Sequence, residues 1–105
     1  MARSRKLYSR IAAVFQLLQS LPPGRVVSYG VVAKRCGLPC ARNVGWILRQ
    51  NRDAAAVPCF KVVLSDGRLT NGYKFGGAAA QRRLLKDDGV VFLPDGRVTA
   101  RALLR

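Results

Sequence analysis

Residues 57–63 read Val-Pro-Cys-Phe-Lys-Val-Val, and Pro58 constrains the local fold more than any other residue of the chain. The proline ring fixes its own φ and disfavours a helical conformation at the residue before it. We therefore expect Cys59 on a stiff, extended entry to a short strand over 61–64, with a Ser-Asp-Gly-Arg turn at 65–68. A thiol held in this way can meet a substrate at a fixed angle. The alternative is that Cys59 is a small buried hydrophobe, the usual state of a free cysteine.

Apolar periodicity predicts a helix on either side of this segment. Over residues 6–20 the apolar positions step by three and four, as they do in an amphipathic helix. These positions are Tyr8, Ile11, Ala12, Phe15 and Leu18. Pro22-Pro23-Gly24 ends that helix, and a further helix is expected over 78–88, closed by Gly89.

Two short helices between these should form a helix-turn-helix. Ser28 is suited to cap the N-terminus of the first helix and Gly37 its C-terminus. The second helix should run over 40–49 with its apolar side facing the core. The inward residues are Val44, Ile47 and Leu48.

Gly45 and Trp46 are unusual residues for the middle of that second helix. A glycine there costs about 1 kcal/mol of helix propensity relative to alanine. This choice makes sense where another molecule must approach the backbone closely. Trp46 is large for an exposed face, and it could either cover the core or contact a ligand.

Two further segments are rich in glycine and turn residues. Residues 71–77 form an expected loop with two aromatic residues, and they lack the spacing of a phosphate-binding loop. Residues 90–93 and 97–99 flank Pro94-Asp95-Gly96, and we expect them to pair as a small terminal β-hairpin.

The charge is strongly unbalanced. Lys plus Arg number 19 and Asp plus Glu number 5, so the formal net charge is +14. In so small a domain this excess favours a polyanionic partner, and a general adaptation to solubility is the alternative. A membrane surface is a weaker alternative, because the basic residues are spread along the chain and do not form one face of an amphipathic helix.

Composition also bounds the class of protein. With 105 residues the chain should form one domain. No apolar run approaches the roughly 18 residues of a membrane helix, and no signal-peptide pattern follows the basic start. We therefore expect a cytoplasmic or nuclear protein. Three cysteines without a histidine cannot complete the four ligands of a structural zinc site, so neither a metal nor a cofactor is expected.

Several short motifs follow one another along the chain: GRVVSY at 24–29, ARNVG at 41–45, VPC at 57–59, SDG at 65–67 and GY at 72–73. Their order and spacing resemble the DNA-binding and active-site domain of the O(6)-alkylguanine-DNA alkyltransferases, and also the shorter alkyltransferase-like proteins. The resemblance implies an α+β, mostly helical fold, a winged helix-turn-helix with a small β-hairpin. Residues 1–105 would form that single domain, without the family's N-terminal domain.

The resemblance also implies a reaction. Such proteins flip an O(6)-alkylguanine out of duplex DNA and transfer its alkyl group irreversibly to their own cysteine, here Cys59. The second helix of the helix-turn-helix enters the minor groove, where Arg42 fills the space that the base leaves. Gly45 permits close approach to the DNA, and Arg49 is expected to contact it as well.

Two tyrosines match residues that handle the target nucleotide. Tyr29 corresponds to the tyrosine that presses on the neighbouring phosphate. Tyr73 corresponds to the tyrosine that hydrogen-bonds the flipped base, with Lys74 in the same pocket. The backbone carbonyls of Cys59 and Val62 would accept from the guanine amino group. The alternative for both tyrosines is a half-buried ring with its hydroxyl in water.

The reactive motif departs from the family's Pro-Cys-His-Arg. Phe60 holds the histidine position, Lys61 the arginine position, and Asp88 the position of the glutamate that holds the histidine. The expected catalytic set is Cys59 with Lys61, Asn51 and Asp88, in which Lys61 and the positive field lower the thiol pKa. A thiol with a pKa of about 8.5 is only a few per cent thiolate at pH 7, so transfer should be slow.

Three functions remain open. The first is a slow, single-turnover DNA repair transferase, because this chain keeps the cysteine that alkyltransferase-like proteins lose. The second is a non-catalytic lesion sensor that recruits other repair proteins, which the missing histidine favours. The third is a general basic DNA-binding protein, which the charge alone would fit. The expected partner is double-stranded DNA containing alkylated guanine, bound by a monomer.

Overall fold

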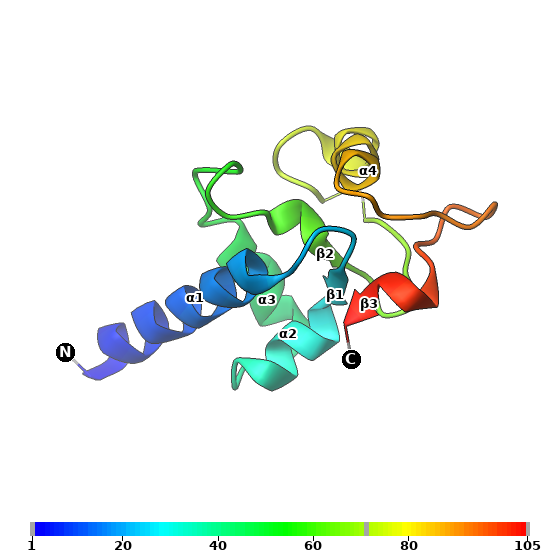
Figure 1. Cartoon of the computed structure of the whole chain (residues 1–105). Coiled ribbons are helices and arrows are strands. Elements are labelled where there is room, and N and C mark those ends of the chain that lie inside the picture. Colours follow the sequence, from blue (N-terminus) through cyan, green and yellow to red (C-terminus); the bar gives the residue numbers. More distant parts are fainter. Residues whose placement is uncertain (1, 71, 105) are drawn as a thin grey trace.

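The computed structural model describes residues 2–70 and 72–104, so Asn71 of the expected glycine-rich loop lies outside the described residues. Its elements are α1 (Ala2–Ser20), β1 (Val26–Ser28), α2 (Tyr29–Arg35), α3 (Ala41–Leu48), the 3-10 turn η1 (Cys59–Lys61), β2 (Val62–Val63), α4 (Gly77–Asp87), the 3-10 turn η2 (Ala100–Ala102) and β3 (Leu103–Leu104). The mostly helical α+β class is therefore confirmed. Figure 1 shows the strands between α1 and α4. In the described part of the chain, no helix is long and apolar enough to cross a membrane.

The strands form one parallel sheet in the order β2-β1-β3. Val27 of β1 pairs with Val62 of β2, and Val26 pairs with Leu103 of β3. Val26 and Val27, which follow the Pro22-Pro23-Gly24 turn, therefore belong to the central strand. β3 is absent from the sequence prediction, because a strand of two residues is too short to show alternation.

Alternating side chains of β1 divide the hydrophobic core into two parts. Val27 and Val62 belong to the part that packs against α1, α2 and α3. Val26 and Val63 belong to the other part, which includes Leu85 of α4. Because successive side chains of a strand point to opposite faces, one short strand supports both parts.

Helix α1 packs on the core mainly through its C-terminal half. Val14 and Leu18 are fully buried there. Ala12 is exposed and Tyr8 is 70% exposed, so these two apolar positions of the predicted amphipathic helix do not face the core. Figure 1 shows the N-terminal end of α1 extending beyond the rest of the molecule.

Helices α2 and α3 form the predicted helix-turn-helix. Ser28 Oγ accepts from Val31 N at 3.2 Å and so caps α2. At the other end Gly37 adopts a φ of 69°, and Leu38 N donates to Ala33 O at 2.8 Å, which closes the helix in a Schellman motif. The buried residues of α3 are Val44, Ile47 and Leu48, as predicted.

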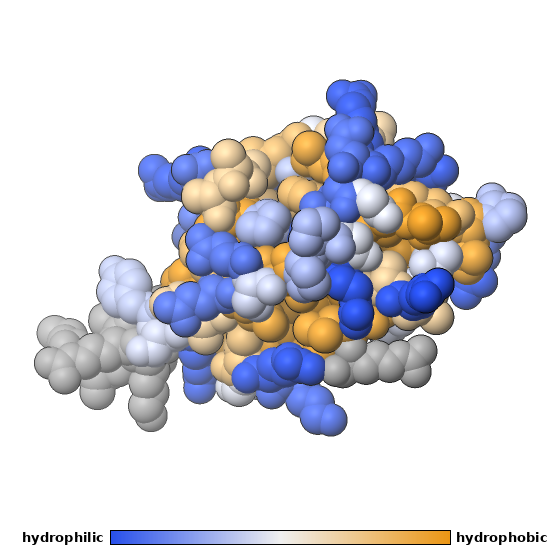
Figure 2. Space-filling view, viewed as in Figure 1, coloured by the Kyte–Doolittle hydropathy of each residue, from blue (hydrophilic) through white to orange (hydrophobic). Residues whose placement is uncertain are grey.

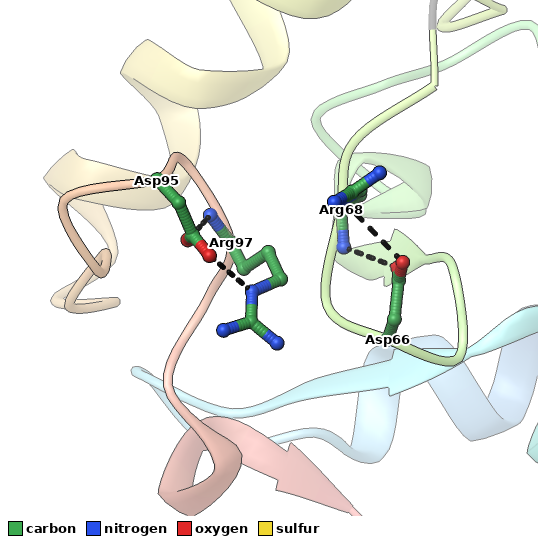
Figure 3. Close-up of polar contacts among 4 residues, drawn as sticks. All are labelled: Asp66, Arg68, Asp95 and Arg97. Carbon is green, nitrogen blue, oxygen red and sulfur yellow. Dashed lines mark hydrogen bonds and ion pairs between the residues drawn. The ribbon is translucent and has the colours of Figure 1, made fainter.

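Two Asp-Gly-Arg turns have the same internal bonding (Figure 3). Asp66 Oδ1 accepts from Arg68 N at 3.0 Å, and Asp95 Oδ1 accepts from Arg97 N at 3.1 Å. Each arginine Nε also returns to the carboxylate of its own turn, at 3.5 Å in the first and 2.6 Å in the second. Both turns lie where the sequence predicts them. The hairpin expected around the second turn is reduced to one antiparallel bridge.

Gly67 joins the two turns and leaves no room for a side chain. Its carbonyl accepts from Val98 N at 2.9 Å, its φ is +90°, and a Cβ there would lie 3.0 Å from Val98 O. Gly67→Ala should therefore lower the free energy of unfolding by about 1–3 kcal/mol in urea denaturation. Gly30→Ala is the control, because its Cβ would meet nothing within 4 Å. Equal losses in both variants would contradict this packing.

Candidate active site and nucleic-acid interface

A pocket of about 220 Å³, which we call the thiol pocket, lies between α3, η1 and the loop before α4. Its lining residues are Tyr29, Gly45, Leu48, Arg49, Cys59, Thr70, Gly72, Tyr73, Lys74 and Gln81. Most of the site residues expected from the sequence therefore meet around one cavity. A Cβ at Gly45 would meet nothing within 4 Å, so the backbone of α3 is open to the pocket.

A larger hollow of about 620 Å³, which we call the outer groove, adjoins the thiol pocket. It is lined by Tyr29, Ala41, Arg42, Asn43, Gly45, Trp46, Arg49, Leu64 and Thr70. Because Tyr29, Gly45, Arg49 and Thr70 line both hollows, the two are continuous along α3. Arg42 lines only the outer groove, whereas the remaining expected residues line neither hollow. Those residues are Asn51, Lys61, Val62 and Asp88.

Cys59 occupies the first position of the 3-10 turn η1, directly after Pro58. Its N–H donates to Val57 O at 2.8 Å, and Lys61 N closes the turn on Pro58 O at 3.1 Å. The expected extended entry is therefore wrong. A proline restrains the residue before it but is compatible with the start of a helical turn. The strand begins only at Val62.

The thiol of Cys59 is largely withdrawn from solvent, since the residue is 5% exposed. Burial raises the pKa of the Cys59 thiol above its ordinary value, and a hydrogen bond from Asn51 and the charge of Lys74 lower it in part. The Asn51 side chain is fixed, because its Nδ2 donates to Val57 O at 2.9 Å and its Oδ1 accepts from Asp53 N at 3.0 Å. Asn51 thus acts on the thiol from a rigid position.

Lys74 connects the pocket loop to the C-terminal end of α3. Its Nζ donates to Arg49 O at 2.8 Å and to Asn51 O at 2.6 Å. A cation is favourable there because the last carbonyls of a helix carry partial negative charge. The same ammonium lies 5.4 Å from the centre of the Phe75 ring. Lys74 therefore fixes the loop that carries Tyr73 and also places a positive charge near the thiol.

Lys61 has a structural position away from the thiol pocket. Its Nζ lies 2.9 Å from Asp88 Oδ2 and donates to Pro22 O at 3.0 Å. Asp88 Oδ2 also accepts from Gly24 N at 3.0 Å. The pair therefore ties the end of α4 to the turn before β1. The expected support of the thiolate by Lys61 is thus corrected, since the lysine whose charge acts on the thiol is Lys74.

Gln81 is a pocket residue that the sequence analysis misses. It is 2% exposed, and its Nε2 donates to Phe60 O at 2.9 Å and to Val62 O at 3.0 Å. A signal was present in the sequence, because Gln81 lies one helical turn before the buried Leu85 and so on the inward side of α4. A polar residue on a buried helical face needs partners, which marks it as a candidate.

Basic side chains are spread over the surface. Figure 2 shows hydrophilic residues scattered over the face seen in Figure 1, with apolar residues between them. Arg42 and Arg49 are the basic residues of the outer groove. The net charge of +14 attracts a polyanion from a distance, whereas these two arginines lie where α3 is accessible. Within the described residues, no group of three or more His, Cys, Asp or Glu side chains could hold a metal ion.

A family model described as the DNA binding domain of 6-O-methylguanine DNA methyltransferase matches residues 10–90. The chain belongs to this family. The matched region includes the helix-turn-helix and every lining residue of the thiol pocket. This 6-O-methylguanine DNA methyltransferase-type domain is therefore the part of the molecule that contains both hollows.

Curated relatives of this family member carry transferase names. A bifunctional methyltransferase/endonuclease from Picrophilus torridus is 39% identical over 93 residues, which are 88% of this chain and 29% of that protein. The methylated-DNA–protein-cysteine methyltransferase of Salmonella typhimurium is 38% identical over 81 residues, 76% of this chain and 46% of that protein. The chain thus spans less than half the length of these relatives.

Solved structures with this fold include complexes with DNA. S. pombe Atl1 in complex with damaged DNA containing O6-carboxymethylguanine aligns with a TM-score of 0.74 at 24% identity, over 91% of this chain and 94% of that chain. At that identity the likeness shows the fold. Mycobacterium tuberculosis OGT in complex with DNA aligns with a TM-score of 0.63 at 31% identity, over 74% of this chain and 48% of that chain.

The two lysines near the reactive turn should differ in their effects on the thiol of this methyltransferase-type domain. Lys74→Met removes a cation that favours the thiolate, so the pKa of Cys59 should rise further above its ordinary value. Alkylation by iodoacetamide, which consumes the thiolate, should then require a higher pH. The measurement uses a Cys36→Ser/Cys40→Ser background, so that Cys59 is the only thiol.

Lys61→Met is the matched variant in the same background. It should leave the pH profile of Cys59 alkylation in place but lower the free energy of unfolding by about 2–3 kcal/mol. This loss is below the usual cost of breaking a buried pair, because the Asp88 side chain is 20% exposed. If the pH profile of Cys59 alkylation shifts in Lys61→Met and not in Lys74→Met, then Lys61 and not Lys74 is the lysine that acts on the thiol.

Proposed function

We propose that the chain is a single-turnover DNA repair protein that accepts the alkyl group of an extruded O(6)-alkylguanine on Cys59. Duplex DNA would bind along the outer groove, with α3 in its minor groove. The supporting observation is a buried thiol in a pocket that opens onto the arginine-bearing face of a helix-turn-helix. A buried thiol cannot reach an atom inside a base stack, so the nucleotide must leave the duplex to react.

Three residues of the outer groove and the thiol pocket have distinct roles in this proposal. Arg42 lies in the outer groove beyond the pocket, where it would fill the space that the extruded base leaves. Tyr29 lines both hollows, so it stands where the backbone of the target nucleotide must bend. The buried Tyr73 hydroxyl would donate to a ring nitrogen of the base.

The transfer step itself requires the Cys59 thiolate. Its sulfur attacks the alkyl carbon, a C–S bond forms, the C–O6 bond breaks, and the electron pair goes to the guanine oxygen. The thiol has released one proton and the purine takes up one, which restores guanine. Phe60 has no titratable group, so the general-base assistance worth about 100- to 10,000-fold is missing. Asn51 and Lys74 favour the thiolate in its place.

A lesion sensor that recruits other repair proteins is the second candidate. The observation that favours it is the burial of Cys59, which raises the thiol pKa in a chain with no histidine to take up the proton. Both candidates use the same groove and pocket to recognise the base. They differ only in whether the alkyl group moves.

The mass of the intact protein distinguishes the two candidates. After a day with excess O(6)-methylguanine duplex, we expect one added methyl group that is absent from Cys59→Ser. The rate should rise with pH and level off above the raised pKa of the thiol, because only the thiolate reacts. No adduct at any pH, together with selective binding of the lesion, would establish the sensor instead.

Trp46 provides a direct measurement of DNA binding in the outer groove. It is the only tryptophan in the chain, and it is 45% exposed. Added duplex should change its fluorescence, with an affinity that falls steeply with salt as counterions are released.

Arg42→Ala should weaken binding to lesion duplex more than to intact duplex, because Arg42 fills its proposed place only when a base is extruded.

A basic residue outside both hollows serves as the control for Arg42. Arg101→Ala removes a charge from η2, at a separate hollow, so it should weaken binding to both duplexes slightly and equally. An equal loss on the two duplexes in Arg42→Ala would remove Arg42 from its proposed role. If Trp46 fluorescence does not change when the protein is saturated with DNA, the DNA does not bind in the outer groove.

A further inference from the structure

The side-chain amide of Gln81 has one satisfied end and one unsatisfied end. Its Nε2 donates to two carbonyls of the reactive segment, Phe60 O at 2.9 Å and Val62 O at 3.0 Å. Because both partners are acceptors, the amide nitrogen must face them and the oxygen must face the other way. Gln81 Oε1 is buried and has no hydrogen-bond partner among residues 2–70 and 72–104.

Tyr73 Oη is a second buried group without a partner in the described part of the chain. Tyr73 and Gln81 are 8% and 2% exposed, and both line the thiol pocket with Cys59. Buried polar groups in folded proteins are almost always hydrogen-bonded, so two unpaired ones in one cavity point to a ligand. The amide oxygen can only accept, and the phenol can donate. The ligand must therefore offer both a donor and an acceptor.

We infer that Gln81 Oε1 accepts a hydrogen bond from the 2-amino group of the flipped base, and so selects 2-amino-6-alkoxypurines. This inference rests on the proposed function of the same pocket. Alkylation at O6 removes the N1 hydrogen of guanine, which leaves the amino group as the strong donor of the base. The resemblance assigns this contact to the carbonyls of Cys59 and Val62, which already accept from Val62 N and Gln81 Nε2 respectively. The amide oxygen of Gln81 is unpaired and takes that role.

The amino group can be tested without changing the alkyl group. The two probes are duplexes that carry O(6)-methylguanine or O(6)-methylhypoxanthine, which lacks only the 2-amino group. Binding is measured in Cys59→Ser, so that no transfer occurs. This protein should bind the O(6)-methylguanine duplex about 10-fold more tightly, as expected for one buried hydrogen bond.

Gln81→Lys is the informative variant, because a lysine can still donate to Phe60 O and Val62 O but cannot accept. In the Cys59→Ser background it should reduce the 10-fold preference to about 2-fold or less. The added positive charge strengthens binding to both duplexes alike, so it cancels in the ratio. If circular dichroism shows that Gln81→Lys is unfolded, the uncharged and similarly sized Gln81→Met replaces it.

Tyr73→Phe is the matched control, since it removes the other unpaired group and leaves the acceptor in place. It should weaken binding to both duplexes and preserve the preference for the duplex whose base carries the 2-amino group. A preference that survives in Gln81→Lys, or that is absent from Cys59→Ser, would overturn the assignment of Gln81. Failure of the proposed function is distinguishable, because Cys59→Ser would then bind O(6)-methylguanine duplex no better than unmodified duplex.

Discussion

Burial of the central strand β1 is the constraint on which the rest of the structure depends. All three of its residues are buried, and it is the only strand paired on both sides in the described sheet. Val27 faces the packed helices α1, α2 and α3, and Val26 faces α4 and the C-terminal segment. The last residue of the strand, Ser28, is also the N-cap of α2. Burial of β1 thereby determines where the helix-turn-helix begins and where Tyr29 enters the groove.

Burial and reactivity oppose each other at Cys59. Water exclusion strengthens every electrostatic contact of the pocket, but it disfavours the thiolate and raises the pKa of Cys59. Asn51 and Lys74 offset part of this effect, and they are direct neighbours, because Lys74 Nζ donates to Asn51 O at 2.6 Å. The Lys61–Asp88 pair uses two charged residues beside the reactive turn for architecture instead. A buried pair of this kind is weak evidence for stability, but it fixes the positions of the segments that it joins.

Local rules predict most of the helical part of the fold. Ser28, Gly37 and the inward side of α3 follow from capping and periodicity alone, because their partners lie within a few residues in the sequence. The parallel sheet does not follow, since its three strands are two or three residues long and far apart in the chain. The exposure of Tyr8 likewise depends on where the body of the molecule ends.

The residues of the candidate site likewise include some that the sequence predicts and some that it does not. The resemblance correctly selects Cys59, Tyr29 and Tyr73, which line one cavity, because those residues lie in motifs with a fixed order. It misplaces Lys61, since sequence adjacency to the cysteine says nothing about the direction of a long side chain. Gln81 is missed because its importance lies in an amide whose bonds reach residues about twenty positions earlier.

The hydrogen bonds of Lys74 fix the distance between the Tyr73 loop and the end of α3. Because its ammonium holds Arg49 O and Asn51 O together, the Tyr73 loop and the end of α3 form a spacer of constant length. Under the proposed function, the register of a duplex along α3 fixes how far a flipped nucleotide reaches towards the sulfur. A bulkier alkyl group therefore cannot gain room by parting the loop from α3. The tolerance for lesion size must come from the part of the pocket that Lys74 does not hold, such as the mouth at Tyr29 that the pocket shares with the outer groove.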